Sequence, residues 1–187
     1  NIMAFVTDAG GNVTSYAEYT DVLQKDQRLL EANVIKVPAE SGFVDATDFI
    51  EDMLSKATDR INIKIKASSW WSGYLNYTGT SVSNPALMPD FNPNRIAARQ
   101  QEFTDMAVFY CMYYYLLPLV ADFSEDDAEV QKIKYYEDKF QGLYNELLAL
   151  ADWYDADGDG TIENSEKVWT NQIVRRSRRR STVVRVN

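Results

Sequence analysis

Residues 45–67 read DATDFIEDMLSKATDRINIKIKA, a run in which apolar residues recur at helical spacing. The apolar positions that repeat at intervals of three and four are Ile50, Leu54, Ala57, Ile61 and Ile65. Such spacing places them on one face of an α-helix. Asp45 precedes the run and is a favoured N-cap residue. We therefore expect a long amphipathic helix from Asp45 to about Ala67, although the alternation of isoleucines leaves its last turns ambiguous with a strand.

Three further segments carry helix signals. Ser15 and Glu18 have the spacing of a capping box, which predicts a short helix to about Leu23. Asn92-Pro93 has the cap and first-turn proline of a helix that we expect to run to about Leu117. The core stripe that we expect on it consists of Phe103, Met106, Ala107, Tyr110, Tyr114 and Leu117. Pro118 is expected to end or kink this helix.

The last predicted helix opens at Ser124, with Asp127 three residues later, and keeps helical spacing to about Trp153. The segment 72–92 is rich in Gly, Ser, Asn and Pro and is predicted to be a long loop. The sequence therefore predicts an all-α fold. We expect a bundle of three long helices and one short helix, with an extended N-terminal segment and a C-terminal arm.

We divide the chain into three parts. Residues 1–153 are the predicted helical body with its N-terminal arm, 154–170 contain a calcium-type loop and its exit, and 171–187 form a basic arm. Six arginines and no acidic residue lie between Arg175 and Val186, so the remainder has 13 basic and 28 acidic residues. A strongly acidic body is a poor general surface for nucleic acid, which confines any such binding to the tail.

The composition argues against an enzyme. The sequence has no histidine, which removes the commonest general base and imidazole metal ligands. The single cysteine, Cys111, excludes an intramolecular disulfide and any Cys-rich zinc site. No phosphate-binding loop or nucleophile motif is present. The uncharged, largely apolar run Met106 to Ala121 is shorter than the ~18–20 residues needed to cross a bilayer, so we expect no membrane partner.

Residues 155–166 read DADGDGTIENSE and fit the twelve-residue calcium loop of the EF-hand at every diagnostic position. The expected ligands are the side chains of Asp155, Asp157, Asp159, Glu163 (directly or through water) and Glu166, with the carbonyl of Thr161. Ca²⁺ is a hard cation that takes six to eight oxygen ligands, which such a loop supplies. We therefore predict a Ca²⁺ site with a structural role, because sensor EF-hands come in pairs and only one loop is present.

The basic arm and one pair of tryptophans are the candidate partner-binding features. The arginines of the arm are Arg175, Arg176, Arg178, Arg179, Arg180 and Arg185. They could contact phosphates, but no aromatic residue lies among them to stack bases. A solvated tail is the second reading. An arm that lies along an acidic neighbour is the third, and it fits better because the body has the complementary charge. Trp70 and Trp71 could form an interface, with core packing as the alternative.

The order of these features resembles the head-to-tail connector (adaptor, or neck) proteins of tailed bacteriophages. The resemblance rests on Thr47 to Ile61 leading to Trp70-Trp71, on the aromatic-rich third helix, and on the final Asp152-Trp153-Tyr154-Asp155. It implies a structural virion protein that forms a ring, commonly of twelve copies, between the portal protein and tail or neck proteins. DNA would pass through its channel without sequence recognition. A calcium loop is not a general property of that family, and the competing hypothesis is a calcium-dependent protein-binding module.

Overall fold

The computed structural model describes residues 5–6, 15–27, 42–43, 45–77, 91–121, 123, 128–164 and 166–167. In chain order, the α-helices are α1 (Tyr19–Lys25), α3 (Ala46–Lys66), α4 (Ser69–Tyr77), α5 (Gln100–Cys111) and α6 (Ala128–Leu150). Shorter turns are the 3₁₀ segments η2 (Pro93–Arg95) and η4 (Leu117–Leu119), and the π-helical turn η3 (Met112–Leu116). The described residues contain no strand, only one isolated antiparallel bridge, so the all-α class is confirmed for them.

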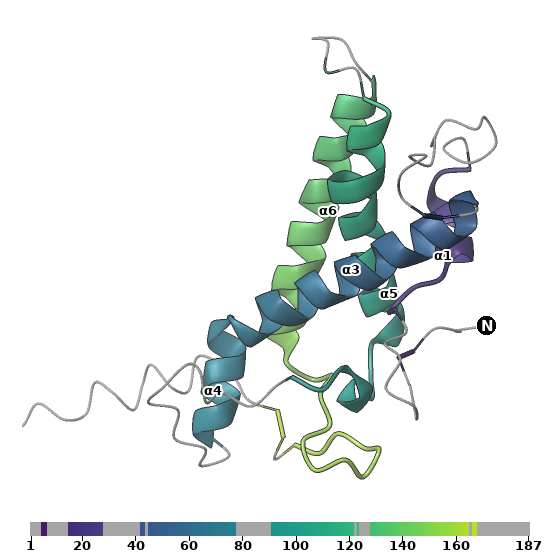
Figure 1. Cartoon of the computed structure of the whole chain (residues 1–187). Helices are drawn as coiled ribbons and strands as arrows, with labels where there is room; N and C mark the ends of the chain where they lie inside the picture. The colour runs from purple at the N-terminus through teal and green to yellow at the C-terminus, as the bar shows by residue number, and fades with distance from the viewer. Residues whose placement is uncertain are drawn as a thin grey trace, which may run out of the picture.

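The arrangement differs from the predicted bundle of three long helices. α5 and α6 form an upright antiparallel hairpin, and α3 crosses it at a steep angle (Figure 1). α5 is the central element, because it packs against α1, α3 and α6. Only α3 and α6, of 21 and 23 residues, are long, whereas α5 has 12 residues. The third long helix is therefore shorter than expected.

α3 has the predicted boundaries. The carboxylate of Asp45 caps the helix by accepting the N–H of Asp48 at 2.9 Å. Its predicted apolar face is buried from Ile50 to Ile65. The ambiguity with a strand is resolved, since Ile61 and Ile65 face the core whereas Ile63 is 59% exposed.

The chain around α3 departs from prediction on both sides. α1 begins at Tyr19 because Glu18, not Ser15, is its N-cap, and the Glu18 N–H donates to Asp21 at 2.9 Å. After α3, Ser68 accepts the N–H of Trp71 at 3.2 Å and so caps a new helix, α4. The predicted loop at 72–92 is therefore wrong for residues 72–77, which belong to α4, while 78–90 lie outside the described residues.

α5 changes its helical form before Pro118. A proline has no N–H and its ring clashes with the carbonyl four residues earlier, which here belongs to Tyr114. The helix widens into the π turn η3 and then tightens into η4, which contains the proline. This change of phase turns Tyr114 outward to 51% exposure, so its predicted place in the core stripe is wrong. The stripe members that are buried are Phe103, Met106, Ala107, Tyr110 and Leu117.

The core lies where the three main helices and the segment after α6 meet. Its largest fully buried side chains include Tyr16, Ile50, Leu54, Trp70, Phe103, Phe140 and Trp153. Val6, in the predicted N-terminal arm, is also buried, and Phe5 packs beside Tyr16 with 5.8 Å between ring centroids. Part of that arm therefore belongs to the body.

Candidate metal centre

The calcium-type loop is set on the end of α6 by a tight reversal of the chain. α6 ends at Leu150, three residues before the predicted end, because Ala151 takes the left-handed conformation with φ of 50°. The indole N–H of the fully buried Trp153 then donates to the Leu147 carbonyl at 2.7 Å. These contacts fix the direction in which the chain enters the loop.

The first residues of the loop are hydrogen-bonded to a segment some sixty residues earlier. The Ala97 N–H donates to the Trp153 carbonyl at 3.0 Å, and the Asp155 N–H donates to the Arg95 carbonyl at 2.8 Å. Ile96 and Tyr154 form the isolated antiparallel bridge between these bonds. This pairing explains why the helix predicted from Asn92-Pro93 does not form there: its backbone bonds go to residues 153–155, and α5 starts only at Gln100.

An ion pair reinforces the same junction. Arg99, in the left-handed conformation with φ of 58°, holds Asp152 through two guanidinium–carboxylate contacts of 2.6 and 2.8 Å. The hydrogen bond from Arg99 lowers the pKa of Asp152 below its usual value. Such a bidentate pair constrains the direction of both side chains.

The junction rests on a cluster of aromatic rings. Trp70 of α4 lies 4.4 Å from Trp153 between centroids, and Trp71 stacks on Tyr74 at 5.1 Å. Trp70 and Trp71 are both buried within the chain, at 1% and 2% exposure. Core packing therefore accounts for both, and the prediction that they form an interface is wrong because neither reaches the surface.

Asp155 is the buried residue of the predicted ligand set, at 4% exposure. Its two carboxylate oxygens accept the N–H groups of Gly158 at 2.6 Å and Gly160 at 2.7 Å. Burial opposes its ionisation, but the N–H groups of Gly160 and Gly158 outweigh burial and hold the pKa of this carboxyl below its usual value. Asp155 is thus kept as an anion.

Asp157 and Asp159 are exposed and lie over the same space. One carboxylate oxygen from each of Asp155, Asp157 and Asp159 can be chosen so that all three lie within 4.8 Å of one another. The N–H of Asp159 lowers the pKa of Asp157. Desolvation and the charges of Asp159 and Glu166 outweigh that bond, and the pKa of Asp157 is raised. The three carboxylates therefore repel one another, which a bound cation would relieve.

Glu166, the twelfth residue of the pattern, folds back to the start of the loop. Its Oε1 accepts the Ala156 N–H at 2.8 Å, and its Oε2 accepts the Glu163 N–H at 2.8 Å. The backbone N–H and side-chain hydroxyl of Thr161 donate to Asp159 at 2.8 and 2.7 Å. Thr161 and Glu163 are exposed at the outer side of the turn.

The turn itself depends on glycine. Gly160, at the sixth position, has φ of +87°, a conformation that side chains other than glycine rarely adopt. A hard cation suits this donor set, which consists of carboxylates gathered by a glycine turn. The residues present therefore fit a hard cation such as Ca²⁺, and those whose oxygens gather to hold it are Asp155, Asp157 and Asp159. Glu166, the predicted twelfth ligand, lies outside this group, and its carboxylate oxygens accept backbone N–H groups instead.

Sequence reasoning missed Arg95 as a part of this centre. Its guanidinium donates to the carbonyl of Ala156 and lies against Gly158, where an added Cβ would stand 3.7 Å from it. The contact joins residues 61 positions apart and leaves no local pattern in the sequence. The arginines predicted to bind a partner, Arg175 to Arg185, lie outside the described residues.

Comparison with protein-family models, curated proteins and solved structures gives no match for this chain. Within the described residues, no helix has the length and apolar character needed to cross a membrane. The function is therefore inferred from the residues and their geometry.

Proposed function

We propose that this protein is a structural subunit of a virion, and that a Ca²⁺ ion in the 155–166 loop stiffens the corner from which its basic arm leaves the body. In the assembly that we propose, copies form a ring of twelve subunits between a portal protein and tail or neck proteins. The acidic body would let DNA pass along the channel without sequence recognition.

The observation that carries the structural role of the metal is the anchoring of the loop. Its entry is bonded to residues 95–98 and packed on the aromatic cluster, so the loop starts from the rigid core, while residues 157–161 are exposed. A sensor EF-hand instead needs a helix pair that can open on binding the ion. Here the loop is joined to a 3₁₀ turn and a helix end, and an ion bound there would hold elements together.

The loop 155–166 contains neither a cysteine nor a histidine. Cys111 is fully buried in α5, and burial raises the pKa of its thiol. With no histidine in the sequence, the carboxylates of the loop have no imidazole partner. A role in assembly uses the features that are present: an anchored loop, exposed aromatic side chains such as Tyr114 and Tyr135, and an oppositely charged arm.

Two measurements test this proposal. Electron microscopy and light scattering of the purified full chain should show closed rings in the presence of Ca²⁺, and purified particles should contain the chain in a fixed ratio to portal and tail proteins. The competing function, a calcium-dependent binding module, predicts a chain of low mass that exposes apolar surface when Ca²⁺ is added. Dye binding to apolar surface that rises with Ca²⁺, together with an absence of rings, would overturn the structural role.

A further inference from the structure

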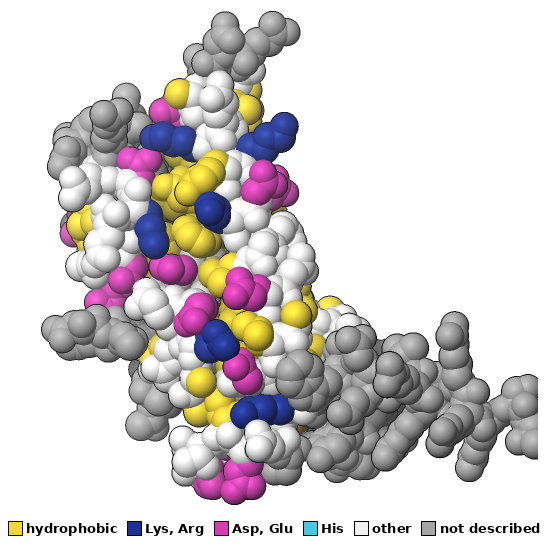
Figure 2. Space-filling view, turned by 180° about the vertical axis from the view of Figure 1, so that it is seen from behind, with side chains coloured by type: hydrophobic (Ala, Val, Ile, Leu, Met, Phe, Trp, Pro, Cys, Tyr) yellow, Lys and Arg dark blue, Asp and Glu magenta, His cyan; other side chains and the backbone are white. Residues whose placement is uncertain are grey.

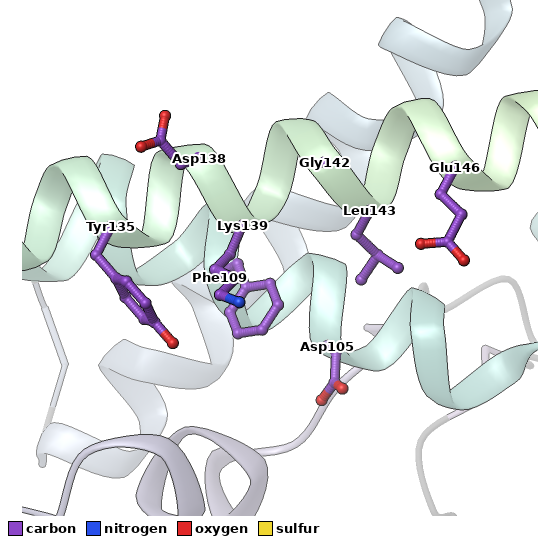
Figure 3. A pocket seen from close by; sticks show the side chains of 8 residues that line it. All are labelled: Asp105, Phe109, Tyr135, Asp138, Lys139, Gly142, Leu143 and Glu146. Atoms are coloured by element: carbon purple, nitrogen blue, oxygen red, sulfur yellow. The ribbon is translucent and has the colours of Figure 1, made fainter.

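A hollow of about 630 Å³ lies between α5 and α6. α5 contributes Asp105 and Phe109, and α6 contributes the remaining lining residues, among them Tyr135, Leu143 and Glu146 (Figure 3). Tyr135 and Leu143 lie on the same side of α6 as Phe109 and form an apolar floor, with the carboxylates of Asp105 and Glu146 beside it, while the Asp138 side chain projects from the outer side of α6. Figure 2 views the molecule from behind Figure 1. It shows a column of hydrophobic side chains flanked by acidic and basic ones.

Two lysine ammonium groups of the chain already lie against residues that line the hollow. The Lys25 ammonium lies 5.4 Å from the centre of the Phe109 ring and 3.0 Å from the Asp105 carboxylate. The Lys139 ammonium lies 5.5 Å from the centre of the exposed Tyr135 ring. Aromatic faces and carboxylates together favour positive side chains. Arginine is favoured over lysine because its planar guanidinium stacks on aromatic rings and forms bidentate hydrogen bonds with carboxylates.

Two carboxylates of the hollow have no partner in the described part of the chain. Asp138, at the rim, and Glu146, at one end, are exposed and form no ion pair there. Gly142 lies between them, and a Cβ added to it would meet no atom within 4 Å. The absence of a side chain at Gly142 keeps the hollow open at its middle.

The chain contains one segment of complementary chemistry. Residues 168–187, beyond the described part, carry six arginines and no acidic residue after Arg175. At about 3.3–3.6 Å per residue, a segment of this length can span at most about 66–72 Å from the metal corner. Contact between an arm of one copy and a hollow of the next is heterologous, and heterologous contacts generate rings where the rotation between copies closes.

We infer that the hollow between α5 and α6 is the docking site for the arginine-rich C-terminal arm of a neighbouring copy. This rests on the proposed ring assembly and names the contact that closes it. Arginines of the arm would pair with Asp138 and Glu146 and stack on Tyr135.

A charge-swap experiment in the full chain tests the contact and its direction between copies. The double variant Asp138→Lys with Glu146→Lys reverses the charge of these two positions of the hollow. The triple variant Arg178→Glu with Arg179→Glu and Arg180→Glu reverses the charge of the arm at those three positions. Each variant alone should associate at least about tenfold more weakly than the native chain, because like charges then meet. An equimolar mixture should recover the association, since the native arm of one variant meets the native hollow of the other. Glu51→Lys with Asp59→Lys, exposed positions on α3, is the charge-matched control and should associate like the native chain.

A steric variant separates docking from folding. Gly142→Leu fills the hollow, while it replaces a poor helix former with a good one, so the helix gains rather than loses stability. We expect Gly142→Leu to lose association and Gly142→Ala to keep most of it.

The outcomes distinguish two failures. If the native chain forms rings and the hollow variants do so equally well, the docking site is wrong and the assembly stands. If single variants lose association but the mixture does not recover it, the arm does not dock between copies and the inference is overturned. A native chain that stays monomeric at all concentrations overturns both the inference and the proposed ring.

Discussion

Asp155→Asn measures how strongly the buried carboxylate holds the loop together. In the native chain both oxygens of Asp155 accept N–H groups, from Gly158 at 2.6 Å and from Gly160 at 2.7 Å. An asparagine keeps one carbonyl oxygen and places an NH₂ group against the other N–H. One hydrogen bond to a charged acceptor is lost and a buried donor is left without a partner. We expect the free energy of unfolding to fall by about 1.5–3 kcal/mol without metal.

The assay is urea unfolding followed by far-UV circular dichroism, with a chelator and then with Ca²⁺. A ligand that binds only the folded state at a concentration one hundred times its Kd stabilises it by about 2.7 kcal/mol. The native chain should show a gain of this size and Asp155→Asn a much smaller one. Glu51→Gln, at an exposed carboxylate on α3, should stay within about 0.5 kcal/mol of the native chain. An Asp155→Asn chain as stable as native in chelator, with the same gain from Ca²⁺, would refute this account.

Three further substitutions probe the junction. Trp153→Phe should lower the free energy of unfolding by about 2–3 kcal/mol, because it removes the indole hydrogen bond and leaves a cavity; a loss under about 0.5 kcal/mol would contradict its place in the core. Arg95→Lys keeps the positive charge but loses the planar guanidinium that donates to the Ala156 carbonyl. Calorimetry should show Ca²⁺ binding weakened about tenfold. Unchanged affinity would show that Arg95 does not position the loop. The pKa of Asp152 is lower in the folded state than in the unfolded state. Its ion pair with Arg99 therefore stabilises the protein at pH values above the pKa that Asp152 has when unfolded. This stabilisation is lost as the pH falls through the pKa that Asp152 has when folded. Asp152→Asn should therefore flatten the fall in stability as the pH drops below the ordinary pKa of an aspartate, by less than about 1 kcal/mol for a pair this exposed. An unchanged acid profile would count against the pair.

The elements that the sequence predicted well are those specified by local pattern. α3 has a cap at Asp45 and an uninterrupted apolar face, and both signals act within a few residues. The gathering of Asp155, Asp157 and Asp159 is similarly local, because the glycine turn and their spacing are enough to bring the three carboxylates together, while Ca²⁺ binding there stays a prediction.

The elements that were mispredicted depend on contacts between distant residues. Asn92-Pro93 begins only a 3₁₀ turn, because the following backbone bonds to residues 153–155. The sequence left Trp70 and Trp71 as interface candidates, because it does not show that α4 packs Trp70 against Trp153. The role of Arg95 is likewise invisible in the sequence, since its partner Ala156 lies 61 residues away. The π turn before Pro118 changed the exposure of Tyr114 through a shift of helical phase that periodicity does not show.

Hydrogen–deuterium exchange of the full chain, with Ca²⁺ and with a chelator, tests most directly whether the metal is a structural element. We predict that Ca²⁺ slows exchange in the loop residues 155–164 and in the paired residues 95–98, while α3, α5 and α6 exchange at unchanged rates. Faster exchange across α5 and α6 on adding Ca²⁺ would mean that the helices open as in a sensor, and it would contradict a corner stiffened by the ion.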